Sequence, residues 1–126
     1  MAKKLLPALL LSLLAAGCST TITNLTPGRE FRNPNGLYPI EAAVATTQQT
    51  LRWDSIKPNV VVAKEFYSMH PTALMTNRWE TLIPVPADAT VIYYRFKFDY
   101  NYNAFGSAPK ANSKLSRMYR LQIMDK

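Results

Sequence analysis

Side chains that commonly carry out chemistry are sparse in this chain. It has one histidine, His70, and one cysteine, Cys18. A lone histidine with no carboxylate or thiol close to it in sequence does not make a metal site. Ser68, beside His70, lacks the Gly-x-Ser-x-Gly turn of many hydrolases. We therefore interpret His70 as a solvated loop residue and predict no catalytic residue, no metal site, no cofactor and no enzyme activity.

The acidic residues give no better support for catalysis. There are eight, and they are scattered along the chain. No two are spaced in a way that picks out an acid–base pair, and no stretch holds the several acids of a calcium loop. The chain has only four glycines, too few for a glycine-rich phosphate loop. These observations favour a binding or structural protein over an enzyme.

Cys18 stands in a context that gives its thiol a different role. Lys3 and Lys4 precede an apolar run, Leu5 to Ala16. A basic start followed by an apolar run and small residues is typical of a secretory signal peptide. The run is shorter than the roughly 20 residues that a membrane-spanning helix needs. Since there is no second cysteine, Cys18 cannot form a disulfide within the chain.

The sequence Leu14-Ala15-Ala16-Gly17-Cys18 resembles the lipobox of bacterial lipoproteins, with Ala15 where leucine is usual. The resemblance implies that the Cys18 thiol is alkylated with diacylglycerol, that the chain is cut before Cys18, and that the new amine is often acylated. Ser19, in place of an aspartate, implies sorting to the outer membrane. The expected location is the bacterial cell envelope, with the protein facing the periplasm or the exterior and held to the membrane through lipid on Cys18.

The sequence thus predicts three segments: a signal peptide (1–17), the lipidated cysteine with a short tether (18–24) and a folded domain (25–126). Without Lys3 and Lys4 the chain keeps 13 basic and 8 acidic residues, a net charge of +5. An exported protein seldom meets nucleic acid, so we expect no nucleic-acid partner. Anionic lipid or glycan is a better match for this charge than nucleic acid. The interpretation that we prefer is that the charge serves solubility.

Periodicity in the domain favours β-strands. Residues 91–102 alternate strictly, with Ile92, Phe96 and Phe98 among those on an aromatic, buried face and Arg95 and Lys97 on a polar face. Further strands are expected over 40–45, over 60–67 after a turn at Pro58-Asn59, and over 78–86. Residues 20–26 fit either a strand or the tether. The last element fits a helix or a strand, and we prefer a strand that forms a hairpin with 91–102.

About seven short strands separated by turns predict an all-β fold, an immunoglobulin-like antiparallel β-sandwich. A small β-barrel is the alternative. Trp53 and Trp79 are candidates for a sugar-stacking platform, but the inward faces of two packed sheets also need large side chains. Arg95, Lys97, Arg117 and Arg120 are candidates for a positive binding patch, which forms if the C-terminal hairpin does.

Three functional hypotheses follow. The first is a membrane-anchored envelope lipoprotein whose domain binds or scaffolds other envelope proteins. The second is a glycan-binding lipoprotein of the cell surface, which an exposed Trp53 or Trp79 on a concave face would favour. The third is a small lipid-anchored enzyme, which would need His70 to lie in a pocket with two acids.

Overall fold

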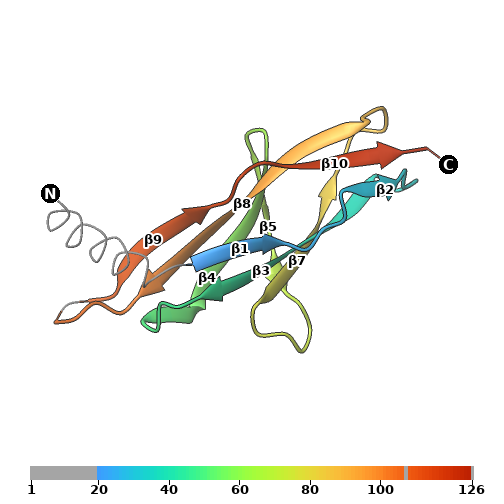
Figure 1. The fold of residues 1–126 in the computed structure, drawn as a ribbon. Coiled ribbons are helices and arrows are strands. Elements are labelled where there is room, and N and C mark those ends of the chain that lie inside the picture. The colour runs from blue at the N-terminus through green and yellow to red at the C-terminus, as the bar shows by residue number, and fades with distance from the viewer. Residues whose placement is uncertain (1–19, 107, 126) are drawn as a thin grey trace, which may run out of the picture.

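The computed structural model describes residues 20–106 and 108–125, and within this part of the chain it contains ten strands and no helix (Figure 1). The strands are β1 (Thr20–Asn24), β2 (Arg29–Phe31), β3 (Leu37–Thr46), β4 (Leu51–Val62), β5 (Glu65–Ser68), β6 (His70–Pro71), β7 (Arg78–Pro84), β8 (Val91–Tyr102), β9 (Lys110–Leu115) and β10 (Tyr119–Met124).

The strands form two sheets that pack face to face. One sheet has the order β1-β3-β7-β6, and the other has the order β2-β10-β8-β4-β5, with β9 also paired to β8. This arrangement matches the ABED and GFC sheets of an immunoglobulin domain when β1, β3, β4, β6, β7, β8 and β10 are taken as strands A to G. Every pairing is antiparallel except that of β2 with β10, which is parallel. The predicted immunoglobulin-like β-sandwich is confirmed.

The core lies between the sheets, and β8 contributes its largest side chains. Tyr94, Phe96 and Phe98 are fully or almost fully buried, as the alternation of the sequence predicted. They pack against the inward residues of β3 and β7, including Ile40 and Ile83. The long aromatic strand is therefore the centre of the domain, because no other strand supplies as many large buried side chains.

Three segments differ from the sequence-based expectations. Thr20–Asn24 form β1, so the folded domain begins before residue 25. Pro58 does not end a strand but lies inside β4, opposite Phe98. The expected single strand over 60–67 is wrong: the chain turns at Ala63, whose φ is 54°, and β5 returns along β4. This two-residue turn was not predicted, because residues that favour β-strands lie on both sides of it.

The last element, β10, is a strand, as preferred, and a further strand, β9, lies between it and β8 in sequence. β9 pairs with the second half of β8 and β10 with the first half. Between β9 and β10 the backbone ladder is continued by a side chain, because the Phe96 amide donates a 2.8 Å hydrogen bond to Oγ of Ser116. The Ser116 amide in turn donates to the Phe96 carbonyl at 2.9 Å. Ser116 thus joins β9 and β10 into one edge along β8.

Ser116→Ala is expected to lower the free energy of unfolding by about 1–3 kcal/mol, because it leaves the Phe96 amide without its acceptor in the sheet. Ser116→Thr keeps the hydroxyl and should cost much less. Urea denaturation of the two variants measures the difference. Equal stability of the alanine and threonine variants would show that the hydroxyl does not contribute to the ladder.

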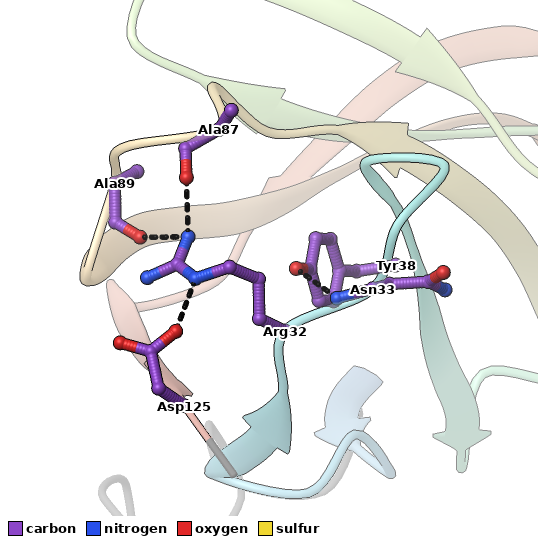
Figure 2. A network of polar contacts seen from close by, with 6 residues as sticks. All are labelled: Arg32, Asn33, Tyr38, Ala87, Ala89 and Asp125. Carbon is purple, nitrogen blue, oxygen red and sulfur yellow. Dashed lines mark hydrogen bonds and ion pairs between the residues drawn. The ribbon is translucent and has the colours of Figure 1, made fainter.

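The end of the sandwich where the chain terminates is tied together by Arg32 (Figure 2). Its guanidinium donates to Oδ1 of Asp125 at 2.6 Å and to the carbonyls of Ala87 and Ala89 at 2.6 and 3.1 Å. The next residue, Asn33, donates its amide to the hydroxyl of Tyr38 at 2.8 Å. These bonds fix the link between β2 and β3, the β7–β8 loop and the end of β10 relative to one another.

Candidate binding surfaces

Trp53 lies at the border of the core, in an irregular part of β4. The register shifts between Arg52, which pairs with Asn101, and Lys57, which pairs with Asp99. Residues 53–56 of β4 therefore bulge opposite a single residue of β8. Oγ of Ser55 accepts a 2.8 Å hydrogen bond from the Asn101 amide, which stabilises the bulge. The bulge turns the Trp53 side chain toward the other sheet.

The two tryptophans have different environments. Trp79 is buried, and its ring meets Phe98 edge to face with centroids 5.4 Å apart. Trp53 lies parallel to Trp79 at a centroid distance of 6.4 Å and remains 44% exposed. Trp79 is thus a core residue, whereas Trp53 stacks on the core and leaves part of its ring in contact with solvent.

Beside Trp53 is an open groove. It is lined by Val44, Ala45 and Thr46 at the end of β3 and by Thr76 and Asn77 before β7. An aromatic ring next to hydroxyl and amide groups is a combination that sugars recognise, since the ring packs on the apolar face of the sugar and the polar groups reach its hydroxyls. The groove therefore has the chemistry of a small glycan site.

A second groove lies on the outer face of the larger sheet. It is lined by Ser55 and Lys57 of β4, by Asp99–Asn101 of β8 and by Ala111–Ser113 of β9. Nζ of Lys97 donates to the Asp99 carboxylate at 3.1 and 3.2 Å. A hydrogen bond from Ser113, followed by the charges of Lys97 and Lys57, lowers the pKa of Asp99 below its usual 3.8. Asp99 is therefore a charged acceptor at the centre of this polar surface.

Because the pKa of Asp99 is lowered by folding, its charged form stabilises the folded state. This contribution is complete above pH 3.8 and is lost as the pH falls through the lowered value in the folded protein. The Asp99→Asn variant is expected to lack this contribution, so its stability should fall less than that of the wild type when the pH is lowered. The effect is small, about 0.2–1 kcal/mol, since the pair is partly exposed. Denaturation at pH 7 and pH 3 checks it: a loss of stability that Asp99→Asn leaves unchanged would contradict this role.

The four basic candidates do not share one surface. Arg95 and Lys97 alternate with the buried residues of β8 and lie on the outer face of the sheet. Arg120 is opposite Tyr93 on the same face. Arg117 instead lies 5.0 Å over the ring of Tyr119, whose side chain packs against the core. Arg117 thus borders a shallow groove between β1 and the β9–β10 junction.

His70 is exposed on the short strand β6. It lies opposite Glu80 of β7, with Nε2 4.0 Å from Oε1 of that residue. The hypothesis of an enzyme needs two acids beside this histidine, and the structure brings one. Among residues 20–106 and 108–125 there is no group of three His, Cys, Asp or Glu side chains that could hold a metal ion.

Comparison with known proteins gives one likeness of fold. No protein-family model matches the chain, and no curated protein is significantly similar to it in sequence. The crystal structure of AggA, the major subunit of aggregative adherence fimbriae type I from Escherichia coli, has a TM-score of 0.45 and 12% sequence identity over 85% of this chain and 95% of that chain.

Two further findings concern apolar segments and apolar side chains. Cys18 precedes the described residues, which contain no helix long and apolar enough to span a bilayer. Leu74 and Phe105 are fully exposed apolar side chains in loops. Sequence reasoning missed both. The available signal was a single large apolar residue in an otherwise small and polar loop, as in the stretch from Asn103 to Pro109.

Proposed function

We propose that the protein is a lipoprotein of the bacterial cell envelope, anchored through acyl chains on Cys18, whose immunoglobulin-like domain is a binding or scaffolding module without catalytic activity. The observation that carries the proposal is the sequence Leu14-Ala15-Ala16-Gly17-Cys18 immediately before a folded domain that begins at Thr20. Two or more acyl chains supply stable anchoring, each buried methylene contributing about 0.8 kcal/mol. Ser19 supports the outer membrane as the location.

The proposal is tested by fractionating cells that produce the full chain. The protein is expected in the membrane fraction, to stay there after a high-salt wash, and to leave it in detergent. Salt resistance separates lipid anchoring from attraction between basic residues and anionic head groups, which salt screens. Complete release by salt would contradict the proposal.

A second candidate function is glycan binding at the groove beside Trp53. It is favoured by the 44% exposure of this ring and by the neighbouring Thr46, Thr76 and Asn77. The ligand would be a neutral or acidic oligosaccharide of the envelope that places one sugar face on the indole.

This candidate predicts that Trp53→Ala weakens binding to a cell-envelope polysaccharide, while Tyr93→Ala, which removes an aromatic ring that is 56% exposed on the outer face of the same sheet, does not. Loss of one stacked ring costs about 1 kcal/mol or more, a several-fold weaker affinity. Calorimetric titration of both variants is the measurement. Equal binding by wild type and Trp53→Ala would exclude this groove as the site.

A further inference from the structure

The start of β1 and the tip of the β8–β9 hairpin lie at the same end of the sandwich (Figure 1). Thr20 pairs with Thr46 at the end of β3. The chain then enters β4 at Leu51, which pairs with Tyr102 at the end of β8. The amide of Asn103 donates to the Thr50 carbonyl at 2.8 Å. The hairpin tip is therefore next to the end of the domain from which the chain continues back to Cys18.

The hairpin reaches farther than β1 does (Figure 1). Thr20 and Thr21 border the same groove as Lys114 and Leu115, which places the start of β1 level with the end of β9. β9 begins four residues before Lys114, at Lys110. At about 3.3 Å per residue, the hairpin passes the start of β1 by roughly 13 Å, before its turn is counted.

The connection from Thr20 back to Cys18 is shorter than this overhang. Two residues span at most about 7 Å. If Cys18 carries acyl chains in the bilayer, the start of β1 is held within that distance of the membrane. A hairpin that extends beyond the start of β1 at this end then meets the lipid surface.

The side chains at the tip suit this contact. Phe105 is 106% exposed, so no part of its ring packs on the domain. Lys110 and Lys114 are exposed on β9. There is no acidic residue between Asp99 and Asp125. An apolar ring with lysines behind it matches the boundary between acyl chains and anionic head groups.

We propose that the tip of the β8–β9 hairpin is a membrane-docking element, with Phe105 embedded in the interface of the same bilayer that holds the acyl chains of Cys18. This inference rests on the proposed function. Docking at two points fixes the orientation of the domain, so that the β7–β8 loop and the Arg32 network face away from the membrane. Partners then approach from that end or from the sides of the sandwich.

The test uses the lipidated protein, reconstituted into vesicles of phosphatidylcholine and phosphatidylglycerol. The mature protein offers no free thiol, since Cys18 is alkylated, so an introduced cysteine takes a fluorescent label alone. Asn103→Cys places the label at the tip and keeps Phe105. Asp88→Cys is the matched control, exposed in the β7–β8 loop at the other end of the twelve-residue strand β8.

The label at position 103 is expected to shift its emission to the blue and to be quenched by nitroxide lipids, while the label at position 88 is quenched only by soluble iodide. Adding Phe105→Ser to the first variant should lower the ratio of embedded to withdrawn hairpin tips about tenfold. Phe105 packs on nothing in the described structure, so this change leaves the fold intact.

Mass measurement of the same samples distinguishes failure of the docking element from failure of the lipid anchor on Cys18. If the chain carries acyl groups on Cys18 but the labels at 103 and 88 are equally accessible to iodide, the docking element is overturned and the anchor stands. If the chain carries no acyl group, the anchor and the docking element both fall.

Discussion

Phe96→Ala is expected to lower the free energy of unfolding by about 3–5 kcal/mol. The side chain is fully buried in the middle of β8. Its ring forms a cluster with those of Tyr94 and Tyr119, with centroid distances of 5.7 and 5.8 Å. Removing it opens a cavity where both sheets meet. The loss is a large share of the roughly 5–15 kcal/mol that stabilises a typical domain.

Tyr93→Ala is the matched control, because it removes an aromatic ring from the same strand on the opposite, exposed face. Its expected cost is much smaller than that of Phe96→Ala. Urea denaturation followed by tryptophan fluorescence measures both. If Tyr93→Ala were the more damaging of the two, the assignment of inner and outer faces along β8 would be reversed.

Cys18→Ala is expected to have the largest effect on processing. Without the thiol no diacylglycerol can be attached, so the chain should incorporate no fatty acid and should keep residues 1–17. Metabolic labelling with a fatty acid and the mobility of the chain on a gel show both consequences. Ser19→Ala leaves the thiol in place and should be labelled and shortened as in the wild type. If the Cys18→Ala variant still incorporated fatty acid, the lipid would be attached to another residue and the prediction would be wrong.

The fold could be predicted from the sequence because its strongest signals come from β8 and from the spacing of turns. Strict alternation from Val91 to Tyr102 placed Tyr94, Phe96 and Phe98 inside, where the structure has them. A buried face that repeats every second residue leaves little freedom of register. By contrast, the return at Ala63 lies within a continuous β-rich stretch, and no glycine or asparagine marks it.

The binding surfaces depend on features that no local pattern encodes. The half-exposure of Trp53 results from a bulge, which is defined by the register between β4 and β8. Arg117 precedes β10 and lies over the ring of Tyr119, whereas Arg95, Lys97 and Arg120 lie on the outer face of the sheet. The expected hairpin alone therefore does not bring the four basic residues onto one surface.

The most direct test of the anchored-lipoprotein account is the intact mass of the protein purified from its own membranes, with the mass of its N-terminal peptide. The account predicts a chain that begins at Cys18 and carries the added mass of diacylglycerol, with a further acyl group where the amine is modified. A mature chain that begins at another residue and carries no lipid would contradict the account.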